Sequence, residues 1–278
     1  MPLLSYSPEE MKPLNGLLKL QNTLAQLRDP KDGCPWDLAQ SHESLLPYFL
    51  EELHEFQDCV LNEKPDNPHF QEELGDLLFQ VLFHFQLLGE KTGVQLDEVA
   101  SKVADKLIHR HPHVFDKNGP KLSRPEEVEA QWEKRKSLEK SHKKSISERL
   151  NDIPKGLPAL QRAQRLGEKA SSLGFDWRSD KEIWSKIKEE ILEFEQATND
   201  THAQEEFGDI LFVLTQLSRK KGWSSEIILT KANDKFTKRM SQMETLINKR
   251  QLVWEKLNVD ELEMLWQEVK KIQTKDAK

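Results

Sequence analysis

Three short blocks of this sequence occur twice and in the same order. Residues 51–56 (EELHEF) correspond to residues 189–194 (EEILEF), residues 72–79 (EELGDLLF) to residues 205–212 (EEFGDILF), and residues 105–110 (DKLIHR) to residues 234–239 (DKFTKR). The offset between the copies falls from 138 to 133 to 129 residues, which indicates shorter loops in the second copy. Because chance does not produce three ordered matches, the repeat predicts two units with a similar fold.

The apolar residues of both copies have the spacing of a helix. In the first copy they occur at i, i+3, i+4, i+7, i+8 and i+11, which places them on one face of a long helix. They are Leu74, Leu77, Leu78, Val81, Leu82 and Phe85, and the second copy has Phe207, Ile210, Leu211, Leu214 and Leu217. Capping boxes at residues 7–10 (SPEE) and 179–182 (SDKE) mark two predicted helix starts. The sequence therefore predicts an all-α fold.

A charged segment separates the two copies. Residues 133–147 (EKRKSLEKSHKKSIS) contain few apolar side chains, and a Pro- and Gly-containing segment then opens the second copy. We therefore predict an N-terminal helical domain over residues 1–132, a charged connector over residues 133–153 and a C-terminal helical domain over residues 154–278. A continuous helix that joins the two halves is the alternative.

Composition argues against several classes of protein. The formal net charge of −7 disfavours nucleic acid as the main partner, since a phosphate backbone needs a basic surface. No run reaches the roughly 18 apolar residues of a membrane span, and the N-terminus has no signal-peptide pattern. Cys34 and Cys59 show neither a metal-ligand spacing nor a disulfide pattern. We therefore expect a cytoplasmic protein that binds neither nucleic acid nor membranes.

Four acids of the second copy form the main candidate site. Glu190 and Glu193 are three residues apart on one helix face, and Glu206 and Asp209 have the same spacing on the next helix. If these helices pack antiparallel, the carboxylates converge, which is costly unless a cation neutralises them. Such oxygen ligands suit Mg²⁺ or Mn²⁺, whereas a di-iron site would use Glu-x-x-His. A solvated helix face is the alternative, but it does not explain two pairs that recur in both copies.

Basic and aromatic residues near these acids in the sequence could bind a nucleotide. Lys186 lies about one turn before Glu190, where it would bind phosphate or simply pair with that carboxylate. Lys235 and Arg239 lie one turn apart on a later helix and are further candidate phosphate ligands. A base could stack on an exposed aromatic ring, although core packing is the commoner role of such residues. The aromatic candidates are Phe175, Trp177 and Trp266.

The sequence resembles the MazG nucleoside triphosphate pyrophosphohydrolases over nearly its whole length. The resemblance rests on Asp29-Pro30, on residues 33–37 (GCPWD), 157–163 (LPALQRA) and 174–177 (GFDW), and on the acid motifs. The acid pattern alone is shared more widely, with dimeric dUTPases and phosphoribosyl-ATP pyrophosphatases. The resemblance implies tandem duplicated MazG-like helical bundles, each completed by homodimerisation. It also implies Mg²⁺-dependent hydrolysis of ribo- and deoxyribonucleoside triphosphates to the nucleoside monophosphate and pyrophosphate, by metal-activated water that attacks the α-phosphorus.

The resemblance further implies roles for individual residues of the second copy. Its catalytic metal ligands would be Glu190, Glu193, Glu206 and Asp209, with Mg²⁺ or alternatively Mn²⁺ as the ion. Lys186, Lys235 and Arg239 would hold phosphates, and Trp266 would lie near the nucleotide. The rival hypothesis is a non-catalytic helical binding protein that senses nucleotides or docks a partner.

The first copy keeps the acids but not all of the cations. Its second possible set of metal ligands is Glu52, Glu55, Glu73 and Asp76, and it also has Lys106 and Arg110. Tyr48 stands at the position equivalent to Lys186. Because the loss of this cation would weaken triphosphate binding, we expect the first unit to be structural, regulatory or weakly active.

Overall fold

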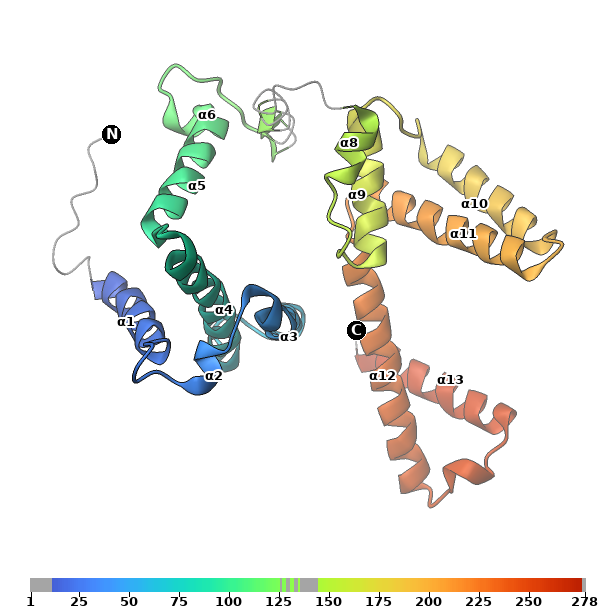
Figure 1. Cartoon of the computed structure of the whole chain (residues 1–278). Helices are drawn as coiled ribbons and strands as arrows, with labels where there is room; N and C mark the ends of the chain where they lie inside the picture. The colour runs from blue at the N-terminus through green and yellow to red at the C-terminus, as the bar shows by residue number, and fades with distance from the viewer. Residues whose placement is uncertain (1–11, 126, 129–130, 133–134, 136–144, 277–278) are drawn as a thin grey trace. The chain divides into compact units, whose positions relative to one another are not determined.

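The computed structural model describes residues 12–125, 127–128, 131–132, 135 and 145–276, and every regular element in these residues is helical (Figure 1). The predicted capping box at residues 7–10 and most of the predicted connector lie outside the described residues. The chain divides into two compact units, Met1–Ser141 and His142–Lys278. Among the described helices, none combines the length and the apolar content that a membrane span requires.

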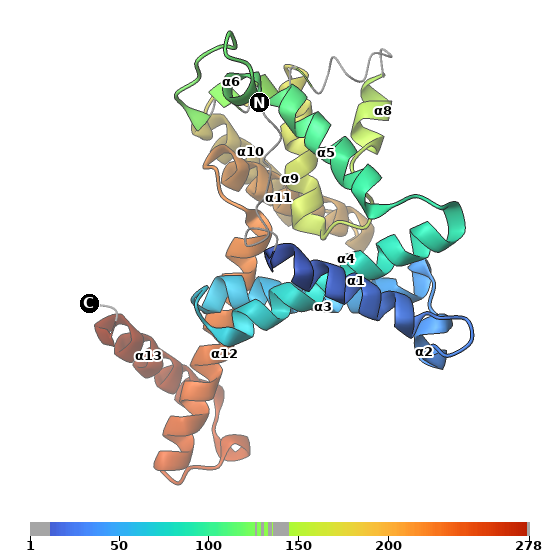
Figure 2. The same ribbon diagram turned by 90° about the vertical axis from the view of Figure 1, so that its left-hand side faces the viewer.

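The first unit is built around an antiparallel helical hairpin. Helices α3 and α4 pack against each other, and α1 lies alongside α4 (Figure 2). The core between them consists of Leu24, Leu45, Leu82, Phe83 and Leu87. The helices of this unit are α1 (Lys12–Leu27), α2 (Pro35–Leu38), α3 (His42–Asn62), α4 (Pro68–Thr92), α5 (Leu96–Arg110) and α6 (Pro112–Phe115).

Local sequence explains where the two helices of this hairpin begin and end. Ser41 and Ser44 form a capping box at the start of α3. The Asn67 side chain accepts a hydrogen bond from a backbone N–H at the start of α4, where Pro68 occupies the first helical position. Gly93 ends α4 with a φ of 75°, a left-handed conformation that suits glycine.

The second unit contains an equivalent hairpin, α10–α11, and a second helical pair, α12–α13 (Figure 1). Helix α9 packs against α11 and α12. One core cluster, Ile183, Ile187 and Val213, lies in the hairpin, and another, Met243, Ile247, Leu265 and Val269, lies between α12 and α13. The helices are α8 (Ile146–Asn151), α9 (Ala159–Ser172), α10 (Asp180–Glu195), α11 (Asp200–Lys220), α12 (Ser225–Lys249), the 3₁₀ helix η1 (Trp254–Lys256) and α13 (Val259–Asp276).

The predicted capping box at the start of α10 is half formed. The Ser179 side chain accepts a hydrogen bond from the Glu182 backbone N–H, as the pattern predicts. The Glu182 carboxylate, however, accepts from the N–H of Arg178, one residue before the expected donor. The helix start is therefore where the sequence predicts it, with a shifted partner.

The apolar spacing predicts helices correctly, but only part of each apolar face is buried within one chain. Of the six residues of the α4 face, Leu82 is buried, whereas Leu74 and Leu78 are 48% and 43% exposed. In α11 the corresponding residues Phe207 and Leu211 are 51% and 43% exposed. Each unit thus leaves one apolar face of its hairpin open.

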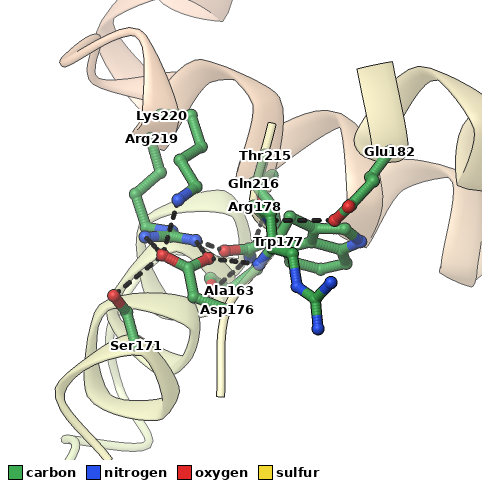
Figure 3. Close-up of polar contacts among 10 residues, drawn as sticks. All are labelled: Ala163, Ser171, Asp176, Trp177, Arg178, Glu182, Thr215, Gln216, Arg219 and Lys220. Atoms are coloured by element: carbon green, nitrogen blue, oxygen red, sulfur yellow. Dashed lines mark hydrogen bonds and ion pairs between the residues drawn. The ribbon is translucent and has the colours of Figure 1, made fainter. Parts of the chain in front are cut away.

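Helices α9 and α11 approach closely at Gly167. A Cβ atom at this position would lie 1.6 Å from Oε1 of Gln216, so no larger residue fits unless Gln216 moves. The Gln216 side chain is wholly buried and donates a hydrogen bond of 2.9 Å to the carbonyl oxygen of Ala163 (Figure 3). Glycine here lets a side-chain amide of α11 bind the backbone of α9.

Candidate functional site

The α10–α11 hairpin brings the acids of the second copy together. Glu190, Glu206 and Asp209 each offer a carboxylate oxygen, and these atoms lie within 4.8 Å of one another. Glu193 contacts Glu190 from the next turn of α10. The four residues share one place in the fold because a short loop reverses the chain between two packed helices.

Lys186 pairs with this cluster from one turn earlier in α10. Its Nζ lies 2.7 Å from Oε1 of Glu190 and 2.7 Å from Oε1 of Glu189. Burial of Glu190, which is 4% exposed, would raise the pKa of its carboxyl group, but hydrogen bonds with Lys186 and Glu193 and the charge of Lys186 together outweigh burial and lower this pKa. The hydrogen bonds from Lys186 to Glu189 and to Glu190 raise the pKa of Lys186 above its usual value.

The cluster carries more negative charge than Lys186 neutralises. The pKa of Glu193 is raised, chiefly by its hydrogen bond with Glu190, then by burial and by the charge of Glu206. The carboxylates of Glu190, Glu193 and Glu206 therefore repel one another, and a further cation would relieve this repulsion. Hard carboxylate oxygens that lie this close together and carry excess negative charge fit Mg²⁺ or Mn²⁺.

Two histidines that lie beside the acids were not predicted from the sequence. Nε2 of His202 lies 3.0 Å from Oε1 of Glu206, and Nε2 of His69 lies 3.0 Å from Oε1 of Glu73 in the first unit. Each histidine stands four residues before its glutamate, and the two are separated by the same 133 residues as the acid blocks. That shared spacing is the signal from which they could have been found.

The structure does not bring Lys235, Arg239 and Trp266 to the four acids within one chain. Arg239 lies over the Trp266 ring, 5.5 Å from its centroid, and donates a hydrogen bond of 2.9 Å to Gln273. Lys235 is exposed on the same helix, α12. Among the described residues of this unit, no hydrogen bond or ion pair joins these three side chains to the acids of the hairpin. Arg239 and Trp266 form a separate basic and aromatic cluster on α12 and α13, and Lys235 lies one turn before Arg239 on α12.

The first unit has an acid cluster of the same form. Oxygens of Glu52, Glu73 and Asp76 lie within 4.8 Å of one another, and Glu55 is exposed beside them. Burial and the charges of its acidic neighbours raise the pKa of Glu52. Oε2 of Glu73 is buried and has no hydrogen-bond partner. Tyr48 packs edge-on against Trp36, with ring centroids 5.7 Å apart, and supplies no cation.

The basic residues of the first unit also pair with an aromatic ring. Lys106 is exposed, and Arg110 lies over the ring of Trp132, 4.9 Å from its centroid. This contact has the form of the Arg239–Trp266 contact. Trp132 was missed in the sequence because no matched block contains it.

The GFDW motif of the second unit is structural except at its phenylalanine. Trp177 packs against the hairpin core, whereas Phe175 is 81% exposed. Asp176 accepts a 2.5 Å contact from Arg219, a 2.7 Å contact from Lys220 and a hydrogen bond from Ser171 (Figure 3). Burial would raise the pKa of Asp176, but these three donors outweigh it and hold the pKa well below its ordinary value of 3.8.

Comparison with known proteins places the chain in a family. The sequence pattern of the MazG nucleotide pyrophosphohydrolase domain matches residues 40–115, which lie in the first unit. The chain is 38% identical to the nucleoside triphosphate pyrophosphohydrolase of Escherichia coli K12 over 263 residues, which are 93% of this chain and 98% of that protein. It is 40% identical to the nucleoside triphosphate pyrophosphohydrolase/pyrophosphatase MazG of Thermotoga maritima over 252 residues, which are 91% and 94% of the two chains. The chain therefore belongs to the MazG nucleotide pyrophosphohydrolase family.

Proposed function

We propose that this protein hydrolyses nucleoside triphosphates to nucleoside monophosphate and pyrophosphate at the acid cluster of its second unit. The observation that carries the proposal is the convergence of Glu190, Glu206 and Asp209 within 4.8 Å, with Lys186 bound at their edge. Relatives that match more than nine-tenths of the chain are named for this activity. Both ribo- and deoxyribonucleotides are proposed substrates, in the cytoplasm, where the two free thiols would stay reduced.

In the hairpin, the carboxylates would bind the metal ion and Lys186 would bind a phosphate group. Glu190, Glu193, Glu206 and Asp209 would hold Mg²⁺, or alternatively Mn²⁺. When bound, the ion lowers the pKa of a coordinated water and polarises the α-phosphate. Lys186 has three N–H donors, so it can keep both of its carboxylate partners and donate a third hydrogen bond to a phosphate oxygen.

We further propose that the two units are tandem copies of one helical bundle and that each is completed by a second chain. Folded monomers rarely expose large continuous apolar patches. On the α10–α11 hairpin, half-exposed residues include Trp184, Leu192, Phe207, Leu211 and Leu214, and on α3–α4 they include Leu46, Leu50, Leu53, Leu74 and Leu78. A homodimer would cover both faces with the same surfaces of its partner.

Dimerisation also gives the basic and aromatic cluster of α12–α13 a place in the reaction. Among the described residues of one chain, no hydrogen bond or ion pair joins Lys235, Arg239 and Trp266 to the acids. We propose that they serve the acid cluster of the partner chain. There the two cations would neutralise the departing pyrophosphate, and Trp266 would stack on the base.

A pyrophosphate-release assay with mixed NTPs and dNTPs tests the activity itself. With Mg²⁺ present, we expect steady release of pyrophosphate and nucleoside monophosphate in equal amounts. Chelation with EDTA should abolish it, and excess Mg²⁺ should restore it. A flat trace from folded protein with every nucleotide and with either Mg²⁺ or Mn²⁺ would instead support a nucleotide sensor.

Mixing two inactive variants tests whether the site spans two chains. We expect Glu193→Ala and Arg239→Ala each to be nearly inactive alone. If acids and cations come from different chains, each mixed dimer has one intact site, so random exchange should recover about a quarter of the parent activity. Recovery is measured after mild denaturation and joint refolding of equal amounts.

The same mixture made from Glu193→Ala and Asp209→Ala provides the control. Both changes lie in the same hairpin, so no mixed dimer has an intact site, and no activity should return. Absence of recovery in the first mixture, with dimers confirmed by light scattering, would mean that each site lies within one chain.

A further inference from the structure

A sulfur, a nitrogen and a carboxylate oxygen meet where α3 ends and α4 begins in the first unit. Cys59 Sγ lies 3.4 Å from Nδ1 of His69, and Oε1 of Glu63 lies 2.9 Å from the same nitrogen. The three ligand atoms all lie within 4.8 Å of one another. This group is distinct from the acid cluster of Glu52, Glu73 and Asp76, although His69 touches both.

The separation of the sulfur and the nitrogen matches a tetrahedral metal site, whereas the 2.9 Å between His69 Nδ1 and Glu63 Oε1 is a hydrogen-bond distance that would widen when a metal binds. Zinc bonds of about 2.3 Å to sulfur and about 2.0 Å to nitrogen place the two ligand atoms about 3.5 Å apart in a tetrahedron. The observed separation between Cys59 Sγ and His69 Nδ1 is 3.4 Å. Thiolate, imidazole and carboxylate together suit Zn²⁺, whereas the all-oxygen clusters of both hairpins suit Mg²⁺.

The second nitrogen of His69 has the partner that a metal-binding histidine usually has. Nε2 lies 3.0 Å from Oε1 of Glu73, so it can donate its N–H to that carboxylate. In that tautomer Nδ1 presents its lone pair to the sulfur and to Glu63, an arrangement that a bound cation would stabilise. Oε2 of Glu63 is buried and has no hydrogen-bond partner, which leaves a further ligand atom available.

The ligands are held in place by the fold and can be reached from solvent on one side. Cys59 is 2% exposed on the last turns of α3, and Glu63 follows at the end of that helix. The backbone N–H of His69 binds the Asn67 cap of α4 at 3.1 Å, which fixes the start of the helix that carries the ring. The His69 side chain is 54% exposed, so an ion can enter past it.

Comparison with the second unit shows which members of the Cys59, Glu63 and His69 group occur in the first unit alone. There the His202–Glu206 pair repeats the His69–Glu73 pair with the same 3.0 Å contact. The position that corresponds to Cys59, at the offset of 138 residues, is Ala197. The histidine–glutamate pair is therefore common to both units, whereas the sulfur ligand occurs in the first unit alone.

We propose that Cys59, Glu63 and His69 form a Zn²⁺ site with one position left for water, and that Glu73 orients His69 from its other nitrogen. On binding, the Cys59 thiol releases its proton to solvent and the sulfur becomes a thiolate ligand. His69 keeps its Nε2 proton and binds through Nδ1. The site would tie the end of α3 to the start of α4. It does not depend on the proposed hydrolysis in the second unit.

Cobalt binding to the full-length protein tests the proposal through the sulfur ligand. The chain is freed of metal with a chelator, supplied with excess Mg²⁺ to fill the oxygen clusters, and titrated with Co²⁺. We expect one equivalent to produce the near-ultraviolet absorption of a thiolate–cobalt bond, and one Zn²⁺ per chain to displace it. After a Mg²⁺ wash, elemental analysis should find one zinc per chain.

Matched variants identify the ligands. Cys59→Ser should lose the thiolate band, whereas Cys34→Ser, the same change at the other cysteine, should keep it. His69→Ala should weaken Co²⁺ binding at least about tenfold, whereas His202→Ala should not. Because His69 is largely exposed, its variant should fold, which far-ultraviolet circular dichroism checks. A parent protein without the band, or a band that persists in Cys59→Ser, would overturn the zinc site. If His69 is instead a protonated imidazolium that pairs with Glu63 and Glu73, the parent protein will show no thiolate–cobalt band.

Discussion

Glu190→Gln is expected to lower pyrophosphate release about 1,000-fold, whereas Glu52→Gln should leave it within about twofold of the parent. Glu190 is the buried member of the second-unit acid cluster, and Lys186 binds it directly. Glu52 is its counterpart in the first unit, where Tyr48 replaces the lysine. Initial rates at saturating Mg²⁺ with each nucleotide measured separately give the comparison.

The glutamine variant separates the loss of a metal ligand from the loss of packing. Glutamine keeps the size of glutamate, and Lys186 keeps its 2.7 Å contact with Glu189, so neither a cavity nor an unpaired cation results. Circular dichroism should show parent helix content in both variants. Equal losses in Glu190→Gln and Glu52→Gln would contradict the proposed division between an active second unit and a weakly active first unit.

Asp176→Asn is expected to lower the free energy of unfolding at neutral pH by about 2–3 kcal/mol. The amide cannot neutralise Arg219 and Lys220, and the Arg219 side chain is only 10% exposed, so its charge would be left largely desolvated. Urea unfolding followed by circular dichroism measures the change. Asp180→Asn is the matched control, because Asp180 pairs with Lys221 where both side chains are 43% exposed. It should cost about 1 kcal/mol or less.

The cost of Asp176→Asn should depend on pH in a predictable direction. The pKa of Asp176 in the folded chain lies below its ordinary value of 3.8, so folding favours the ionised carboxylate. This contribution is complete at pH values above 3.8 and is lost as the pH falls through the lowered pKa. The stability difference between parent and variant should therefore be constant from pH 7 to about pH 4 and shrink below it. A stability difference between parent and variant that grows as the pH falls would contradict a lowered pKa of Asp176 in the folded chain.

Periodicity and repetition in the sequence predict most of the local fold. The spacing of Leu74, Leu78 and Leu82 predicts the helix, and the i, i+3 acid pairs predict the faces that meet in the hairpin. These predictions succeed because they depend on the geometry of single helices and on one short loop. The burial of those leucines depends instead on what packs against them, and the single chain leaves Leu74 and Leu78 half exposed.

The candidate site is predicted in part for the same reason. Glu190 and Lys186 lie on one helix, so their contact follows from spacing. Arg239 and Trp266 lie on α12 and α13, outside the hairpin, and no local spacing in the sequence predicts where these helices lie relative to the acids. The spacing of Cys34 and Cys59 in the sequence likewise does not predict the group of Cys59, Glu63 and His69 at the first hairpin. Its members are one cysteine, one glutamate and one histidine brought together by a chain reversal.

Gly167 leaves the space in which Gln216 binds Arg219, and it therefore affects the ion pair between Arg219 and Asp176. Gln216 fits over this glycine, and Oε1 of its amide accepts a hydrogen bond from Nε of Arg219, which in turn binds Asp176. A methyl group at residue 167 would displace the amide and thereby free the guanidinium that Asp176 needs. One alanine in α9 would thus act as a remote charge mutation: the protein would lose stability at neutral pH, and its stability would fall less steeply below about pH 4, without any change in an ionisable residue.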